Sequence, residues 1–406
     1  MRALFPLVLV DQELGHVWKP RLHEIATAVH DVVSAETSFL SHSLAHGYHF
    51  ELGKLEALDL AGSSITLAPV SGPDGKPVLP RREISYGRLV LALGSDANDF
   101  GTPGVREHCH FLNSTADAER IRQRLLALLM RVARGVQDDV SIAIVGGGAT
   151  GIELAAEIYH SLDSVRTLEP QIRPEQMNLT VLEAGQRVLG ASPPEQSEYA
   201  TGTLLARGIR LMTGSRVRRA DAAGLHLDDG QTVAADLVVW AAGVRGPALL
   251  SSLLGLPLSS TGRVLVDGHL QCVHCPGVFA LGDCAQWTDP RTGQPAPYTA
   301  QVASAQARYL AALLARGNPG GPNIPPFRFA SKGSVVSLGE DGAVGNLTTR
   351  FGQDSKGALI QGLSAKWVYG LLLRRHEVAV HGWGRAAARL LVEKLQRTYQ
   401  PRIKLH

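Results

Sequence analysis

The centre of this chain combines an apolar strand pattern, a glycine-rich loop and a helical pattern. Residues 140–145 form the apolar run, and Gly146, Gly148 and Gly151 follow it with the spacing G-x-G-x-x-G. The first glycine permits a sharp turn, the second lets the backbone approach a pyrophosphate, and the third lets the helix pack closely on the strand. The helix N-terminus then offers free N–H groups to phosphates. The segment therefore predicts a dinucleotide-binding fold.

An acidic residue, Glu183, ends the next predicted strand. An acid at this place accepts hydrogen bonds from the adenosine ribose and repels a 2′-phosphate, which favours NADH over NADPH. Glu183 follows the loop by more than the usual ~20 residues. We explain this spacing by an extended polar connection over residues 161–177. A glycine-rich turn without a ligand is the alternative, and the combination of strand, loop, helix and acid argues against it.

The rest of the chain limits the class of protein. Strand and helix patterns alternate along most of the 406 residues, which predicts an α/β protein with parallel sheets and more than one domain. A net charge of +3, without a basic repeat or zinc-finger spacing, argues against a nucleic-acid partner. No apolar run reaches the ~18 residues of a membrane-spanning helix. We predict no metal site.

A second nucleotide site is present only in part. Asp11 follows a predicted strand over residues 7–10, in the same position that Glu183 has after its strand. The pair Gly282-Asp283 follows a predicted strand over residues 277–281. An acid at the end of such a strand binds ribose in dinucleotide folds. Asp283 is expected to lead into a helix, and a plain helix N-cap is its alternative role.

Several separate motifs resemble those of the type II NADH:quinone oxidoreductases. The resemblance covers nearly the whole chain, although the tail from Ser331 is similar in character only. The motifs are Val10-Asp11 with residues 16–24, residues 91–95 with 98–104, residues 146–153, residues 241–244 and residues 280–285.

The resemblance implies two Rossmann-like domains, for FAD and NAD, and a C-terminal membrane-associating α+β segment. It also implies the activity: hydride passes from NADH to FAD, and the electrons pass to a membrane quinone without proton pumping. The expected segments are 1–113 (first part of the FAD domain), 114–262 (NAD domain), 263–330 (second part of the FAD domain) and 331–406 (membrane binding or dimerisation).

The resemblance also assigns residues. Asp11 would hold the FAD ribose, and Asp283 the ribityl–phosphate part. Gly146, Gly148, Gly151 and Glu183 would bind NADH. Further cofactor-binding positions are Lys19, Gly94, Ser95, Ala242, Gly243 and Gly282.

Three residues are candidates for catalysis. Glu153 would orient groups near the nicotinamide or move a quinone proton, and an ordinary first-turn glutamate is its alternative. The family carries A-Q-x-A-x-Q beside the flavin. Gln301 matches this motif, but Ala305 takes the second glutamine position, and Gln306 lies about 100° further around a helix. An amide can donate a hydrogen bond to a quinone carbonyl and alanine cannot, so the type of quinone and its affinity stay open.

The strand and glycine loop expected roughly 20–30 residues before Asp11 are absent from this sequence. Either a late start codon or a truncated copy explains this. We expect a chain that begins at Met1 to hold FAD poorly, because nothing would cradle the FAD pyrophosphate.

The cysteines leave other functions open. Cys272 and Cys275 form a C-x-x-C motif, for which two inert thiols, buried or at the surface, are the favoured interpretation and a redox pair or a zinc site the alternative. A sulfide:quinone reductase needs cysteines at the flavin, and Cys109 does not obviously serve. The remaining alternatives are a diaphorase or disulfide reductase and a non-catalytic NAD-binding membrane protein.

From Ser364 onward the tail contains nine Lys/Arg and two Glu, and Trp and Leu residues recur among them at helical spacing. This composition predicts an interfacial helix on anionic lipid, with a core helix or a homodimer interface as alternatives. We therefore expect a peripheral protein on the cytoplasmic face of the bacterial inner membrane, with NADH and a membrane quinone as partners.

Overall fold

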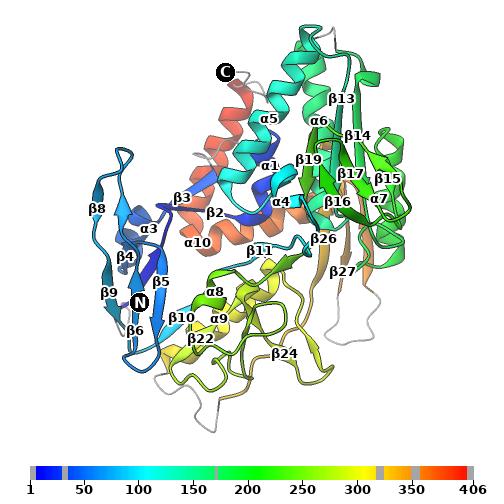
Figure 1. Ribbon diagram of the computed structural model, residues 1–406. Coiled ribbons are helices and arrows are strands. Elements are labelled where there is room, and N and C mark those ends of the chain that lie inside the picture. Colours follow the sequence, from blue (N-terminus) through cyan, green and yellow to red (C-terminus); the bar gives the residue numbers. More distant parts are fainter. Residues whose placement is uncertain (1–5, 30–34, 170–171, 317–323, 349–356, 400–406) are drawn as a thin grey trace. The chain divides into compact units, whose positions relative to one another are not determined.

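The computed structural model describes residues 6–29, 35–169, 172–316, 324–348 and 357–399 (Figure 1). The chain forms two compact units, each assembled from segments far apart in sequence. Unit 1 contains Met1–His16, Glu36–Asp96 and Val244–Ser331, and unit 2 contains Val17–Ala35, Ala97–Gly243 and Lys332–His406. The expected α/β class is confirmed.

Unit 2 is built around a five-stranded parallel sheet in the order β12-β19-β13-β14-β15 (Figure 1). Its central strands β13 and β19 are almost entirely buried and mostly apolar, the pattern of a parallel sheet covered on both faces. Strand β14 lies on one side of the central strand β13, and β19 lies on its other side. Parallel sheets bind ligands at such a switch point in the strand order. The strands are β12 (His110–Phe111), β13 (Val140–Val145), β14 (Met177–Leu182), β15 (Arg210–Met212) and β19 (Leu237–Trp240).

Three long helices pack around this sheet through one apolar core. Helix α5 (Thr115–Ala133) starts with a capping box between Ser114 and Asp117, which satisfies the first free N–H groups. Helix α6 (Ala149–Leu168) follows the glycine loop, and α7 (Pro194–Ala206) follows β14.

The expected extended connection over residues 161–177 was wrong for its first half. Helix α6 continues to Leu168, and a short 3-10 turn, η2 (Pro174–Gln176), precedes β14. Ile158, Leu162 and Val165 are buried at helical spacing, so packing holds this stretch in a helix despite its polar residues. A longer helix therefore accounts for much of the distance between the loop and Glu183.

The C-terminal part of unit 2 matches the expected strands and helices. An antiparallel sheet precedes α10 (Gly362–Tyr399), in which two helices meet at Gly382, whose φ is +75°. The smaller elements are η1 (Lys19–Arg21), α1 (Leu22–Ala26), α4 (Val105–His108), β16 (Val217–Asp221), β17 (Gly224–Leu227), β18 (Thr232–Val233), β26 (Gly333–Ser337), η4 (Gly339–Asp341), β27 (Ala343–Leu347) and β28 (Ala358–Gln361).

Unit 1 contains short parallel pairs, β1–β4, β10–β22 and β21–β23, and an antiparallel sheet β5-β6-β9. Its strands are β1 (Val8–Asp11), β4 (His49–Leu52), β5 (Leu55–Asp59), β6 (Ser64–Leu67), β7 (Val70–Ser71), β8 (Pro77–Leu79), β9 (Arg82–Ser85), β10 (Leu89–Leu91), β21 (Val264–Leu265), β22 (Val278–Ala280), β23 (Ala285–Gln286), β24 (Thr288–Asp289) and β25 (Gln294–Pro295). Its helices are α3 (Phe39–His46), α8 (Leu249–Ser252) and α9 (Ala300–Ala315). Four short strands fall at the limits of the units, namely β2 (Gly15–Val17), β3 (Glu36–Ser38), β11 (Asp96–Ala97) and β20 (Val244–Arg245).

The prediction that Gly282-Asp283 leads into a helix was wrong in detail. The pair begins only a three-residue 3-10 turn, η3 (Gly282–Cys284), and the chain then returns to extended structure. The next long helix of unit 1, α9, starts at Ala300. Within the described residues, none of the helices is both long and apolar enough to cross a bilayer.

Candidate active site

The glycine loop has the geometry that dinucleotide binding requires. Gly146 has a φ of +113°, and a Cβ there would lie 2.8 Å from the backbone nitrogen of Ala242. A Cβ on Gly151 would lie 1.9 Å from the carbonyl oxygen of Gly146, so only glycine lets α6 start this close to β13. A Cβ on Gly148 meets nothing within 4 Å. Gly148 thus faces open space at the start of α6, where a pyrophosphate can approach the backbone.

Glu183 is held directly against this loop. Its Oε2 accepts the Gly147 N–H at 2.7 Å, and its Oε1 accepts the Gly185 N–H at 2.7 Å. The carboxylate is therefore fixed at the carboxyl end of β14, beside the glycines. Ala242 reaches the same edge from β19, and Gly243 follows it with a φ of +67°. The structure brings together the residues predicted for NADH.

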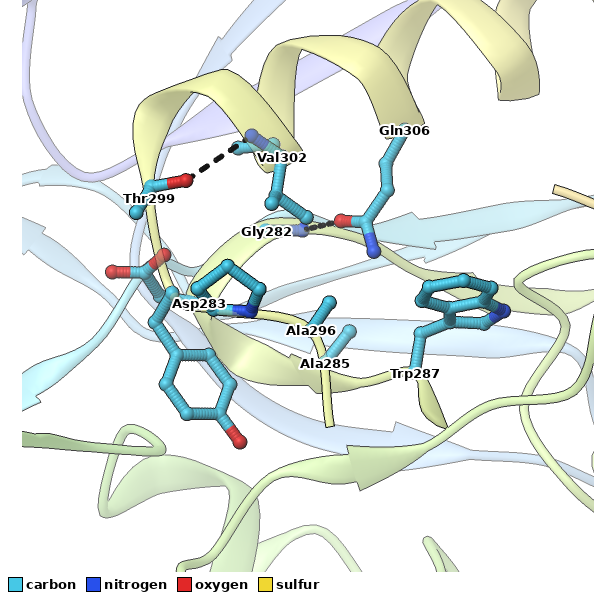
Figure 2. Close-up of a pocket in the computed structure, with 11 residues that line it drawn as sticks. Gly282, Asp283, Ala285, Trp287, Ala296, Thr299, Val302 and Gln306 are labelled. Carbon is cyan, nitrogen blue, oxygen red and sulfur yellow. Dashed lines mark hydrogen bonds between the residues drawn. The ribbon is translucent and has the colours of Figure 1, made fainter. Parts of the chain in front are cut away.

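In unit 1, Gly282 and Asp283 line a pocket at the N-terminus of α9 (Figure 2). Ser95 donates its hydroxyl to Asp283 Oδ2 at 3.0 Å, and the Gly282 N–H donates to Gln306 Oε1 at 2.7 Å. Thr299 caps α9 by accepting the Val302 N–H. The other lining residues include Trp287 and Ala303.

This pocket fits the polar part of a flavin nucleotide. A carboxylate and a hydroxyl can bond a polyhydroxyl chain. The capped N-terminus of α9 adds a partial positive charge where an electron-rich ring or phosphate would lie. Gly94 and Gly282 both have a φ of +70°, so glycine is needed at each.

Arg263 is a residue of this site that sequence analysis missed. Its side chain is 1% exposed, and its Nε donates to the backbone oxygen of Asp283 at 3.0 Å. The guanidinium also lies 3.6 Å from the centre of the Tyr298 ring and donates to the Val244 carbonyl. Arg263 therefore holds the Asp283 turn from behind. A lone Arg 20 residues before the acid carries no motif, so sequence reasoning gave no signal for it.

The other predicted cofactor and quinone residues lie apart along the fold. Asp11 ends β1 in unit 1, where its carboxylate accepts the Glu13 N–H at 2.9 Å, and burial raises its pKa. Lys19 begins η1 in unit 2. Gln301 lies in the first turn of α9, and Gln306 is buried with its oxygen engaged by Gly282. Gln306 thus supports the Gly282 turn, and a direct role toward quinone stays a prediction.

Glu153 is not an ordinary exposed first-turn acid, because it is only 9% exposed. Its Oε1 accepts the Ser337 N–H of β26 at 3.0 Å. Loss of water on burial raises its pKa to about 8, and nearby Glu24 and Glu157 act in the same direction, whereas the Ser337 N–H opposes them. Glu153 is therefore mostly protonated at neutral pH.

The surroundings of Glu153 come from α1 and α10. Arg21 pairs with Glu24 at 2.7 Å and lies 4.0 Å from Glu377 of α10. The indole of Trp18 stacks on His376 of the same helix, with ring centres 4.5 Å apart. These contacts fix α10 against the segment that carries His23. Sequence analysis did not foresee them, because the partners are more than 300 residues apart.

The four cysteines are buried, as the inert-thiol interpretation expects. Burial raises the pKa of Cys109 to about 12 and of Cys284 to about 11, and it also raises the pKa of Cys272. At these three cysteines the nucleophilic thiolate is therefore scarce at neutral pH. Within the described residues, no group of three or more His, Cys, Asp or Glu side chains could hold a metal ion.

We expect iodoacetamide to leave all four thiols of the folded protein unmodified and to label them after unfolding. We also expect C272S/C275S to oxidise NADH at the wild-type rate. Mass spectrometry of the labelled chain checks the first point. Rapid labelling of Cys272 in the native protein, with loss of turnover in the double variant, would instead support a redox-active pair.

Comparisons with known proteins agree with this geometry. The family described as pyridine nucleotide-disulphide oxidoreductase matches residues 5–307. The type II NADH:quinone oxidoreductase of Haemophilus influenzae is 35% identical over 98% of this chain and 93% of its own length. An internal alternative NAD(P)H-ubiquinone oxidoreductase of Solanum tuberosum mitochondria is 31% identical over 79% of this chain and 67% of its own.

Among solved structures, NDH2 of Plasmodium falciparum in complex with NADH superposes with a TM-score of 0.82 at 16% identity, covering 98% of this chain and 95% of that one. The sulfide:quinone oxidoreductase of Aquifex aeolicus superposes with a TM-score of 0.74 at 14% identity, covering 98% and 90%. At these identities the structures show a shared fold.

Proposed function

The chain belongs to the pyridine nucleotide-disulphide oxidoreductases and, within them, to the type II NADH:quinone oxidoreductases, and from this premise we propose which residues carry its reaction. The protein is an FAD-dependent NADH dehydrogenase that reduces quinone. The fixed contact between Glu183 and the glycine loop is the observation that carries the assignment of the NADH site.

NADH binds at the carboxyl edge of the unit 2 sheet. Its pyrophosphate lies over Gly148, where the structure leaves space and the N-terminus of α6 is positive. Glu183 receives the ribose hydroxyls, and its charge disfavours a 2′-phosphate. The ends of β13 and β19 and the start of α6 converge there, at Gly146, Gly151, Ala242 and Gly243.

FAD is held in unit 1 by the pocket around Asp283, with Ser95 fixing the carboxylate and Gly94 and Gly282 allowing close backbone approach. Asp11, also in unit 1, binds the adenosine ribose. When bound, FAD supplies hydride acceptance and electron transfer to quinone. The chain's own task is to orient the two cofactors and to manage the proton.

Glu153 manages that proton. A carboxyl group with a pKa near 8 can give and regain a proton close to neutral pH, as an acid–base group needs. Gln301 is the amide that donates to a quinone carbonyl. Because Ala305 replaces the second amide of the motif, the quinone is held by fewer hydrogen bonds. Gln306 contributes indirectly, because its side-chain oxygen holds the Gly282 turn.

Helix α10 places the protein on a lipid surface. Leu363, Trp367 and Leu371 recur every four residues, so they lie on one face, and they are 68%, 76% and 65% exposed. Arg375 and Arg385 are also exposed on this helix. An apolar stripe beside basic residues suits the interface of an anionic membrane, and we place it on the cytoplasmic face of a bacterial membrane.

We expect W367A/L371A to bind anionic phospholipid vesicles about tenfold more weakly than wild type, because two exposed apolar side chains no longer enter the interface. Co-sedimentation at low and high salt measures this. L40A/L44A, which removes two exposed leucines from α3 of unit 1, is the control. Unchanged vesicle binding together with a broken homodimer would show that the stripe is a dimer interface instead.

Steady-state turnover with different acceptors tests the proposed function. FAD-loaded protein on vesicles should oxidise NADH in a quinone-dependent reaction, far faster than it oxidises NADPH. Glu183→Gln should narrow the preference for NADH. Turnover that ignores quinone and uses only a soluble dye would indicate a diaphorase, and NADH binding without turnover a non-catalytic protein.

A further inference from the structure

Arg263 places a positive charge inside unit 1. The residue is 1% exposed, and its guanidinium donates to two backbone oxygens, those of Asp283 at 3.0 Å and Val244 at 2.8 Å. Both acceptors are neutral carbonyl groups, which an uncharged amide could bond equally well. A buried charge is costly unless it is paired. The charge of Arg263 therefore asks for a reason beyond these two hydrogen bonds.

This charge lies beside the flavin pocket. Arg263 contacts two of the residues that line the pocket, because its Nε bonds the Asp283 backbone and its guanidinium carbon lies 3.6 Å from the centre of the Tyr298 ring. A cation this close to a ring centre is attracted by the electrons of the ring. The Tyr298 ring and the Asp283 turn thus hold the guanidinium next to the wall of the pocket.

The guanidinium stays charged in this place. Burial lowers the pKa of Arg263, whereas Tyr298, Asp283 and Cys284 act in the opposite direction. Because the ordinary pKa of a guanidinium lies far above neutrality, Arg263 remains protonated at neutral pH. The carboxylate of Asp283 is the nearby charge of opposite sign, and the Ser95 hydroxyl donates to it at 3.0 Å. One positive and one negative charge therefore accompany the pocket.

Reduction by NADH changes the charge of the flavin. NADH leaves as NAD⁺ after it gives up a hydride, so the flavin ring gains one negative charge. A lone carboxylate at the pocket would oppose this change, because like charges repel, and they do so strongly where water is scarce. Asp283 is needed to bind the polyhydroxyl chain of the cofactor, so the site cannot omit the acid. A cation beside Asp283 offsets the repulsion instead.

We propose that Arg263 offsets the charge of Asp283 and thereby raises the reduction potential of the bound FAD. Its charge favours the reduced, anionic flavin over the oxidised flavin, and its hydrogen bond fixes the Asp283 turn. Arg263 acts through Asp283 and Tyr298, so it is a positioning residue. This inference rests on the proposed FAD site around Asp283.

The test separates the charge of Arg263 from its hydrogen bonds. Arg263→Gln keeps an amide that can bond the carbonyls and removes the charge, whereas Arg263→Lys keeps a charge. The potential of bound FAD is measured without oxygen against a reference dye, at pH 6 so that the lysine stays protonated. In Arg263→Gln, reduced flavin should lose at least about tenfold more affinity than oxidised flavin, which lowers the potential by about 30 mV for a two-electron couple. Arg263→Lys should lie closer to wild type.

Arg291→Gln is the matched control, because it removes an exposed arginine of unit 1 that also donates to a backbone carbonyl, that of Phe329 at 3.0 Å. Its potential should not change. A folded Arg263→Gln protein whose bound FAD keeps the wild-type potential would overturn the proposal. An equal fall in the Gln and Lys variants that follows a lowered Tm would also overturn it, because that pattern marks a purely structural residue. The same samples show whether NADH reduces the wild-type flavin, so a failure of the proposed function is seen separately.

Discussion

Replacing Gly148 with valine should raise the Kd for NADH at least about a hundredfold while changing the free energy of unfolding by no more than about 1 kcal/mol. The backbone of Gly148 has a φ of −74° and a ψ of −178°, which valine adopts readily. Its side chain would enter the open space in which a pyrophosphate must approach the N–H groups of α6. Binding is therefore blocked without disturbing the fold.

Two other glycines serve as comparisons in the same titration and thermal melt. Gly151→Ala should lower Tm as well as NADH affinity, because the new Cβ would lie 1.9 Å from the Gly146 oxygen. Gly202→Ala, on the exposed side of α7, should raise Tm and leave affinity alone, since alanine is favoured over glycine in a helix by about 1 kcal/mol. If Gly148→Val bound NADH as tightly as wild type, the nucleotide could not lie over this loop.

Replacing Glu153 with glutamine should reduce the rate of quinone reduction by about a hundredfold, the usual share of a positioned acid–base group. Reduction of bound FAD by NADH should continue, because hydride transfer takes no proton from Glu153. Stopped-flow absorbance of the two half-reactions separates these effects. Glu195→Gln removes an exposed first-turn acid of α7 and is the control.

The same substitution should change how stability depends on pH. The pKa of Glu153 is near 8 when folded and near its ordinary 4.5 when unfolded. Between these values the folded protein holds a proton that the unfolded chain has lost, so stability falls as pH rises, and the loss is complete above about pH 8. Glu153→Gln should remove this fall, raising Tm relative to wild type at pH 9 more than at pH 5. Parallel Tm curves for the two proteins would show that Glu153 is not buried in this way.

The arrangement of the proposed NADH site was largely predictable from sequence, because its parts are local. The glycines, α6 and Glu183 follow one another along the chain, and each carries its own chemical signature. The structure changed only the path between them, where burial of Leu162 and Val165 extends the helix. The strand–acid pattern also located Asp283, although it could not tell a three-residue turn from a helix.

The surroundings of Glu153 were not predictable in the same way. Its pKa is raised by burial and by Glu24 near the start of the chain, and the opposing hydrogen bond comes from Ser337 in the C-terminal part of unit 2. No spacing rule links these segments. Arg263 was missed for a similar reason, because its partners are backbone carbonyls, which leave no mark on the sequence.

The most direct test of the account is the visible absorption spectrum of the protein with added FAD, recorded without oxygen before and after NADH, and again after quinone. We predict that NADH bleaches the bands of bound flavin within the turnover time and that quinone restores them, whereas Gly148→Val prevents the bleaching. Bound flavin that NADH does not bleach, or that quinone does not restore, would contradict the assignment of this chain as an NADH:quinone oxidoreductase.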